Sequence, residues 1–166
     1  MPNSDQGATR DRYMLIPRVL IFVRRGPLVL LLKGAPSKRL WAGRYNGIGG
    51  HVESGENILS AARRELLEET GLKADLWLCG TVVVDTDSNP GICLFIFSGE
   101  APQGDCKPSE EGTLEWVPLE GRSDLNMVED LPVLLDHIRK MKRGDPPFHA
   151  RSFYKNNVLT VEFAGG

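Results

Sequence analysis

The spacing of hydrophobic and polar positions predicts β-strands over much of the chain. Aliphatic and β-branched residues fill 13–23 and 28–32, and the intervening Arg24-Arg25-Gly26-Pro27 is typical of a hairpin turn. Asn156 and Asn157 indicate a second hairpin, because asparagine tolerates the positive φ angles of a tight turn. Further strands are predicted at 76–85, 92–98, 114–119, 148–154 and 158–163, and polar loops at 33–44 and 100–112. A short glycine-rich strand and a turn are predicted over 45–53.

Two segments have the periodicity of amphipathic helices instead. In the first, Asn57 is a good N-cap and Gly71 can end the helix in the left-handed conformation. A second helix is expected over 130–143, where leucines recur at helical spacing before a basic last turn, a glycine and two prolines. The apolar stripe that can dock the first helix on a sheet consists of Leu59, Ala62 and Leu66.

Helices interleaved with strands, hairpins and a crossover together imply an α/β fold in which helices cover a mixed sheet. The chain has 166 residues, which is long enough to bury a substantial core. We see no internal repeat or second domain. We therefore expect a flexible N-terminal tail over 1–12 and a single domain over 13–166.

Composition narrows the class of protein. A chain with 41% hydrophobic and 25% charged residues is ordinary for a globular protein, and the net charge of −2 argues against a dedicated binder of duplex nucleic acid. The cysteines form no C-x-x-C pair, so neither a disulfide framework nor a cysteine zinc site is indicated. No segment approaches a membrane-spanning length, and we expect a cytoplasmic protein without a membrane partner. Monomer and homodimer both remain open.

The strongest chemical signal is a cluster of carboxylates on the first helix. Glu65, Glu68 and Glu69 stand at i, i+3 and i+4, so they share one face within a turn. Like charges this close are unfavourable unless a cation neutralises them, and hard oxygen ligands suit Mg²⁺ or Mn²⁺. The alternative is a solvated acidic surface, which is the usual explanation of a charge run.

The residues around the cluster favour the metal site over the solvated surface. The stretch 50–72 resembles the Nudix box, and it matches that pattern at Gly50, Glu56, Arg64, Glu65, Leu66, Glu68, Glu69, Gly71 and Leu72. A chance match in a chain of this length has a probability on the order of 10⁻⁷. The resemblance implies the Nudix fold, a three-layer α/β/α sandwich with a central mixed β-sheet, and a metal-dependent hydrolase.

The resemblance also implies roles for single residues. Glu56 is expected to pair with Arg64, whose guanidinium can fork to two oxygens and fix the carboxylate rotamers. Glu111 matches a loop glutamate that is a candidate base or metal ligand in MutT-type members, with Glu110 as the adjacent alternative and Glu69 as the other candidate base. The groups expected to bind Mg²⁺ are the carboxylates of Glu65, Glu68 and Glu69, the main-chain carbonyl of Gly49, and Glu111.

Residues outside the box are expected to choose the substrate. The run 41–50 resembles the segment before the box in MutT-type enzymes that act on oxidised purine nucleotides. In those enzymes the position of Asn46 bonds a purine base edge, which suits an amide with both donors and acceptors. An asparagine that merely turns the backbone before Gly47 is the alternative. Trp41 lies in the same loop and can border the pocket.

The segment before the second helix departs from that resemblance. The oxidised-purine enzymes have a tryptophan and two aspartates in this stretch, whereas this chain has Val128, Glu129 and Asp130 and one residue fewer. Neither stacking under the base nor strict selection of an oxidised purine therefore follows. Recognition of the base by the acids Glu129 or Asp130 can still occur.

We therefore predict a protein that hydrolyses a small nucleotide with Mg²⁺ as cofactor. The predicted reaction converts a nucleoside triphosphate to the monophosphate and pyrophosphate, with an oxidised purine deoxynucleotide such as 8-oxo-dGTP as one candidate substrate. The first alternative is hydrolysis of another nucleoside diphosphate derivative or of an RNA 5′ end. The second is a Nudix-fold module that binds nucleotides without turnover.

Overall fold

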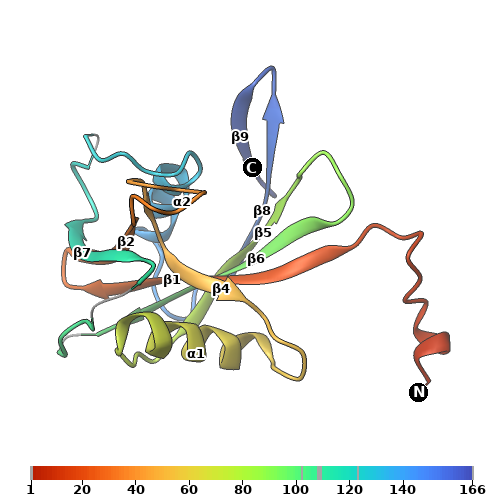
Figure 1. Cartoon of the computed structure of the whole chain (residues 1–166), viewed down its shortest axis with the longest axis horizontal. Coiled ribbons are helices and arrows are strands. Elements are labelled where there is room, and N and C mark those ends of the chain that lie inside the picture. Colours follow the sequence, from red (N-terminus) through yellow and green to blue (C-terminus); the bar gives the residue numbers. More distant parts are fainter. Residues whose placement is uncertain (1, 102, 108–109, 123, 166) are drawn as a thin grey trace.

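The strand-forming runs assemble into one curled mixed sheet, seen in the computed structural model that describes residues 2–101, 103–107, 110–122 and 124–165 (Figure 1). The sheet order is β3-β2-β1-β6-β5-β8-β9, with β4 also paired to β1 and β7 to β2. The β1–β6 and β5–β8 pairs are parallel and the other pairs are antiparallel. The strands are β1 (Leu15–Arg25), β2 (Leu28–Gly34), β3 (Tyr45–Asn46), β4 (Ile48–His51), β5 (Trp77–Val84), β6 (Gly91–Glu100), β7 (Gly112–Pro118), β8 (Phe148–Lys155) and β9 (Val158–Phe163).

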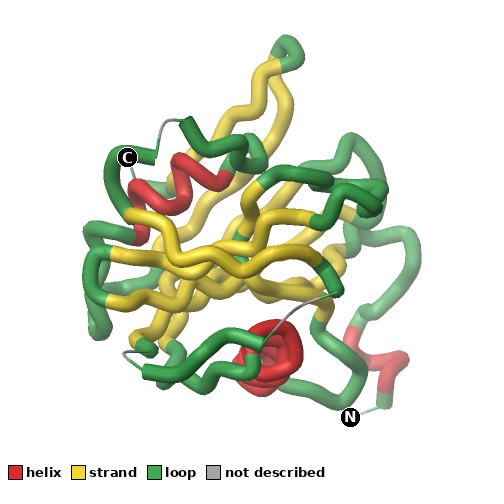
Figure 2. The backbone as a smooth tube through the Cα atoms, turned by 60° about the vertical axis from the view of Figure 1, so that its left-hand side comes forward, coloured by secondary structure: helices red, strands yellow, loops and turns green. Residues whose placement is uncertain are grey.

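Two helices cover opposite faces of this sheet. Figures 1 and 2 show α1 (Ile58–Thr70) below the strands and α2 (Leu131–Ile138) on the other side. Side chains along β1 point alternately to the two faces of the sheet, so the strand contributes to both cores. Ile21 packs in the core under α1 and Phe22 in the core under α2. This arrangement confirms the predicted α/β/α sandwich with a mixed sheet.

Several predicted boundaries differ from the structure. Arg24 and Arg25 lie in β1 rather than in a turn, because they pair with β2 and leave a two-residue turn at Gly26 and Pro27. Gly26 takes a φ of +56°, which a glycine tolerates without strain. One short strand and a turn are expected over 45–53, but the structure has two short strands there, because β3 pairs with β2 and β4 pairs with β1.

The second helix is shorter than the 130–143 predicted. It ends at Ile138, its last buried residue, and a turn follows in which the Met141 N–H donates to the Ile138 carbonyl. Lys142 is then held by the Asp145 carboxylate, which accepts its backbone N–H. The basic residues expected in the last helical turn therefore lie beyond the helix.

Other expectations concern the chain ends and the cysteines. A 3₁₀ turn, η1 (Asn3–Gln6), precedes β1; the flexible tail over 1–12 and the domain over 13–166 stay predictions, and residue 1 lies outside the described residues. The loop between β6 and β7 lies where predicted, although positions 102, 108 and 109 fall outside the described residues. All three cysteines are free thiols. Among the described helices, none is long and apolar enough to cross a membrane.

Candidate active site

Local sequence signals define both ends of α1. The Asn57 side-chain oxygen accepts the backbone N–H of Ser60 at 2.9 Å, which satisfies one of the free donors of the first turn. Gly71 ends the helix with a φ of +74°, and its N–H donates to the Leu67 carbonyl. Both predicted caps are confirmed.

The buried side of α1 fixes where its carboxylates lie. Ala62 and Leu66 are buried against β1 and β4, and Leu59 is half-buried beside them. Glu65 and Glu69 are partly buried at the edge of this same side, whereas Glu68 is exposed, and Glu65 lies directly over Gly50 in β4. A Cβ at position 50 would lie 2.3 Å from Glu65 Oε1. A side chain at position 50 would therefore displace the Glu65 carboxylate from its present place.

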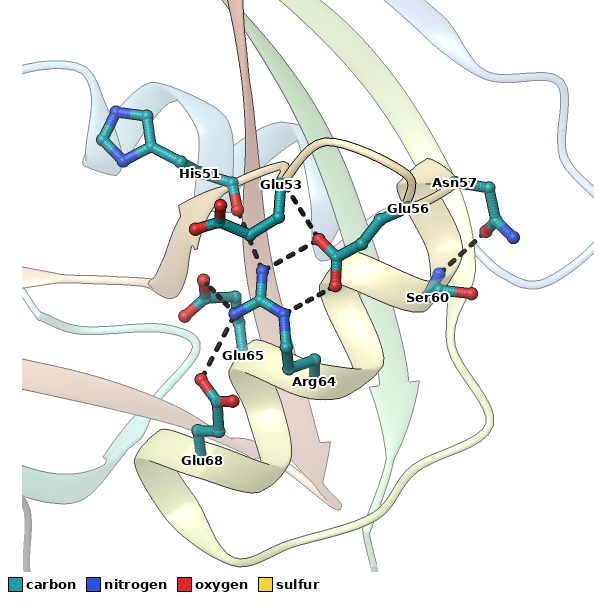
Figure 3. A network of polar contacts seen from close by, with 8 residues as sticks. All are labelled: His51, Glu53, Glu56, Asn57, Ser60, Arg64, Glu65 and Glu68. Carbon is teal, nitrogen blue, oxygen red and sulfur yellow. Dashed lines mark hydrogen bonds and ion pairs between the residues drawn. The ribbon is translucent and has the colours of Figure 1, made fainter.

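Arg64 is the centre of a polar network on this side of the helix (Figure 3). Its Nε and Nη2 donate to the two oxygens of Glu56 at 2.6 and 3.0 Å, a bidentate pair. Its Nη1 donates to Glu65 Oε1 at 2.8 Å and to Glu68 Oε2 at 3.2 Å, and its Nη2 also reaches the His51 carbonyl at 3.1 Å. Arg64 therefore holds three carboxylates at once, and its single positive charge offsets one of their three negative charges.

The ion pair between Glu56 and Arg64 shifts the pKa of both residues. Hydrogen bonds from Arg64, together with the Glu53 backbone N–H, lower the pKa of Glu56 to about 2. The carboxylates of Glu56 and then Glu65 raise the pKa of Arg64 above its ordinary value. Glu56 therefore remains ionised over the physiological range. Its predicted pairing with Arg64 is present in the structure.

Glu69 has a different environment from the other glutamates of the helix. Burial, and then the charges of Glu65 and Glu111, raise its pKa to about 7, against the opposing effects of the Gly49 backbone N–H and Lys38. Its Oε2 is buried and lacks a hydrogen-bond partner among the described residues. A carboxylate with an unpartnered oxygen and a near-neutral pKa can either bind a cation or accept a proton.

The donor set suits a divalent cation, although the carboxylates do not yet converge. Among the described residues, no three histidine, cysteine, aspartate or glutamate side chains form a ready cation site, since Arg64 holds Glu65 and Glu68. The unpartnered Oε2 of Glu69 and the neighbouring carboxylates are the hard oxygen ligands that Mg²⁺ prefers. The ligand roles of Glu65, Glu68, Glu69 and the Gly49 carbonyl stay predictions.

Glu111 reaches the same place from the loop before β7. Its carboxylate forms an ion pair with Lys38, and its backbone carbonyl accepts the N–H of Ala35, which ties the two loops together. Its charge acts on Glu69, as described above. Glu110 is exposed and is absent from the described lining of the cavity. The structure therefore favours Glu111 over its neighbour.

A cavity of about 310 Å³ extends from this point across the α2 side of the sheet. Its lining includes Trp41, Asn46, Gly49, Glu69, Glu111, Glu129 and Asp130. All four predicted base-recognition residues therefore share one cavity with Glu69 and Glu111. The described lining does not include Glu56, Arg64, Glu65 or Glu68, which form the Arg64 network beside it.

Trp41 in the loop before β3 and Asn46 in β3 itself are two of these residues. Asn46 Oδ1 accepts the Gly47 N–H at 2.8 Å, so the asparagine turns the backbone as well as lining the cavity. Trp41 is half-exposed at the rim, with a φ of +65°, and Leu40 beside it is exposed. The two explanations considered for Asn46 are thus compatible.

The segment before α2 carries the acids. It runs beside β3, where the Val128 N–H donates to the Tyr45 carbonyl, and Val128 itself is buried. Glu129 Oε2 accepts the Tyr154 hydroxyl at 3.0 Å, while burial raises the pKa of Asp130. At the cavity this segment therefore presents a buried aliphatic residue, Val128, and the two acids Glu129 and Asp130.

Several lining residues escaped the sequence reasoning. Lys38, Arg44 and Tyr154 lie in loops or at a strand end, where no local pattern marks them. Arg18 and Ser152 did carry a signal, because each is a polar residue at an inward position of a strand, in line with buried neighbours.

Comparisons with known proteins show which domain family this sequence matches and which hydrolases it is similar to. The sequence matches the NUDIX domain over residues 14–137. It is 38% identical over 103 residues to the oxidized purine nucleoside triphosphate hydrolase of Mus musculus, a match spanning 61% of this chain and 65% of that protein. It is 40% identical over 60 residues to the NAD-capped RNA hydrolase NudC of Pasteurella multocida, spanning 36% and 22%.

Solved structures agree as well. The MutT protein of Bacillus halodurans superposes with a TM-score of 0.76 and 25% identity, covering 92% of this chain and 99% of the other. The domain match covers most of the chain and includes every residue of the Arg64 network and both acids before α2. The chain therefore belongs to the NUDIX domain family.

Proposed function

We propose that this protein hydrolyses a nucleoside triphosphate to the monophosphate and pyrophosphate, with Mg²⁺ or Mn²⁺ as cofactor. The observation that supports this most directly is Glu69, which carries an unpartnered buried oxygen and a pKa of about 7 where the acidic helix meets the cavity. The substrate class also draws on the similarity to the mouse oxidized purine nucleoside triphosphate hydrolase. An oxidised purine deoxynucleotide such as 8-oxo-dGTP is the leading candidate.

The chemistry requires charge neutralisation and an aligned water. A divalent cation, when bound, neutralises phosphate oxygens and lowers the pKa of a coordinated water. Arg64 keeps Glu56 ionised and holds the side chains of Glu65 and Glu68 by hydrogen bonds. A water oxygen forms a new P–O bond as the bridging P–O bond breaks, and the water proton passes to a carboxylate. Glu69 and Glu111 are the candidates for that proton, since both line the cavity.

A second candidate function has its own support. The similarity to NAD-capped RNA hydrolases favours cleavage of the diphosphate at an RNA 5′ end or in a dinucleotide. That match covers 60 residues, which are 36% of this chain and 22% of the other protein. The cavity also remains compatible with a module that binds nucleotides without turnover.

A competitive substrate panel tests the proposal. We would incubate the protein with 8-oxo-dGTP, dGTP, dATP, NAD and a 5′-triphosphorylated RNA in Mg²⁺, in Mn²⁺ and in EDTA, and identify the products by ³¹P NMR. We expect pyrophosphate and a nucleoside monophosphate, formed only with a divalent cation. Preferential cleavage of NAD or RNA would support the second candidate instead, and measurable binding without turnover of any compound would contradict catalysis.

The variant Glu69→Gln tests the role of Glu69 with the same substrate panel. The change is isosteric and removes only the negative charge, so we expect at least a hundredfold loss of kcat with an unchanged circular dichroism spectrum. Turnover at the wild-type rate in this variant would remove Glu69 from the site.

A further inference from the structure

Polar atoms without a partner concentrate at the active-site cavity. In the described part of the chain, five buried side-chain nitrogen or oxygen atoms lack a hydrogen-bond partner. Three of the five, Arg18 Nε, Glu69 Oε2 and Ser152 Oγ, belong to residues that line this cavity. Buried polar groups are nearly always bonded in native proteins, so the concentration indicates a ligand that supplies the missing partners. A cation accounts for Glu69 but not for Arg18 and Ser152.

The sheet register places these two residues at the ends of an aliphatic floor. Arg18 on β1 pairs with Leu94 on β6, and Ser152 on β8 pairs with Val84 on β5. Between them, Ile92 on β6 pairs with Val84. All five residues line the cavity, and Ser152 is only 1% exposed. The floor is therefore apolar across its middle and polar at its two ends.

Such a floor suits the nucleoside rather than the phosphates. The anionic and cationic groups expected to handle phosphates, Glu69, Glu111 and Lys38, come from α1 and from the loops flanking β2 and β7. Leu94, Ile92 and Val84 instead offer a flat aliphatic surface on which a base or sugar ring can lie. The atoms that meet Arg18 and Ser152 are then those at the edge of the nucleoside.

The chemistry of Arg18 specifies what kind of atom this is. A guanidinium only donates hydrogen bonds, so its ligand must present acceptors. No carboxylate forms an ion pair with Arg18 in the described residues. The Ser152 hydroxyl can add a second donor. An uncharged oxygen of the base or of the sugar fits both.

We propose that Arg18, assisted by Ser152, is a specificity-determining residue that donates hydrogen bonds to a carbonyl or hydroxyl oxygen of the bound nucleoside. The inference rests on the proposed function, since it assumes that the cavity holds a nucleotide. Arg18 is then a hydrogen-bond donor on the sheet, and Glu129 and Asp130 are acceptors elsewhere along the cavity, so the nucleoside is contacted from two sides.

A chemical double-mutant cycle tests this proposal without turnover. Dissociation constants of nucleoside monophosphates are measured by calorimetry in EDTA for the wild type and for Arg18→Gln. IMP against AMP removes the 6-oxo group, and 2′-deoxy- and 3′-deoxy-IMP remove one hydroxyl each. We expect Arg18→Gln to weaken the binding of IMP about tenfold. The same substitution should weaken the binding of the analogue that lacks the contacted oxygen by less than twofold. The analogue that shows this coupling identifies the oxygen.

The matched control is Arg24→Gln. Arg24 lies on the same strand and the same side as Arg18 and also has a buried Nε, but it lines a different depression beside Met141. Its replacement should leave all four affinities within twofold. If Arg18→Gln weakens all four ligands equally, or none, the contact with a nucleoside oxygen is refuted.

Ser152→Ala provides a readout in the free protein. Removal of an unsatisfied buried hydroxyl should leave the melting temperature unchanged or higher, while IMP binds about threefold more weakly. A clear fall in melting temperature would show a structural role and remove Ser152 from the subsite. A wild-type protein that binds no nucleotide, with or without Mg²⁺, would contradict the proposed function itself, whereas binding without coupling to Arg18 contradicts only this inference.

Discussion

At the scale of single residues, the glutamates of α1 divide into two kinds. The sequence shows equivalent carboxylates at helical spacing, and it predicts that a cation must neutralise them. In the structure Arg64 forms ion pairs with Glu65 and Glu68, whereas Glu69 is buried and forms no ion pair with it among the described residues. The raised pKa of Glu69 instead means that this carboxyl group is partly protonated near neutral pH, which reduces its charge. Spacing alone cannot reveal this division, because it depends on the depth of each carboxylate against β4.

The raised pKa of Glu69 predicts how stability varies with pH in the metal-free protein. An ordinary glutamate in the unfolded chain ionises near pH 4.5, whereas folded Glu69 ionises near pH 7. The stabilising contribution of this difference is complete below pH 4.5 and is lost as pH rises through 7. Glu69→Gln lacks this dependence. In EDTA we therefore expect the variant to melt about 3–5 °C above wild type at pH 8, with no such difference at pH 4.5.

Differential scanning calorimetry across this range checks the prediction. The difference in melting temperature between variant and wild type should grow steadily between pH 5 and pH 8. Saturating Mg²⁺ should reduce the difference at pH 8 by stabilising the wild type more than the variant. A difference that stays constant with pH would mean that Glu69 titrates as it does in the unfolded chain.

At the scale of elements, prediction succeeded where the determining contacts are local. Both ends of α1 were predicted because Asn57 and Gly71 act on backbone groups within four residues. The end of α2 was predicted too late, because Met141 returns to the core through tertiary packing that helical spacing does not record. The split between β3 and β4 likewise depends on which distant strand each one meets. Long-range pairing, rather than propensity, decided these boundaries.

The attachment of α1 to the sheet predicts a sharp contrast between adjacent leucines. Leu66 is 1% exposed in the core beneath the helix, and Leu67 is 41% exposed. Leu66→Ala should lower the free energy of unfolding by about 2–5 kcal/mol, because it leaves a cavity between α1 and β1. Leu67→Ala makes the same small gain in helix propensity and should change the free energy of unfolding by about 0.5 kcal/mol or less. Urea denaturation measures both, and equal losses would contradict the predicted docking.

At the scale of the whole molecule, the site is assembled from segments far apart in the chain. Glu69 comes from α1, Lys38 from the loop after β2, Glu111 from the loop before β7, and Asp130 from the segment before α2. The family resemblance supplied Glu111 and the acids, because motif positions carry over along the sequence. It could not supply Lys38 or Arg18, whose places at the cavity follow from the curl of the sheet and the pairing of loops.

This assembly couples Glu69 to two loops with opposite signs. The charge of Glu111 raises the pKa of Glu69 and the charge of Lys38 lowers it. Glu111→Gln should therefore lower the pKa of Glu69, and Lys38→Met should raise it. A ¹³C NMR titration of the labelled glutamate carboxyl groups in EDTA measures both shifts without turnover. Glu110→Gln is the matched control, since Glu110 is exposed and outside the described cavity lining. Shifts of the same sign in the Glu111 and Lys38 variants would mean that altered loop packing, rather than charge, controls Glu69.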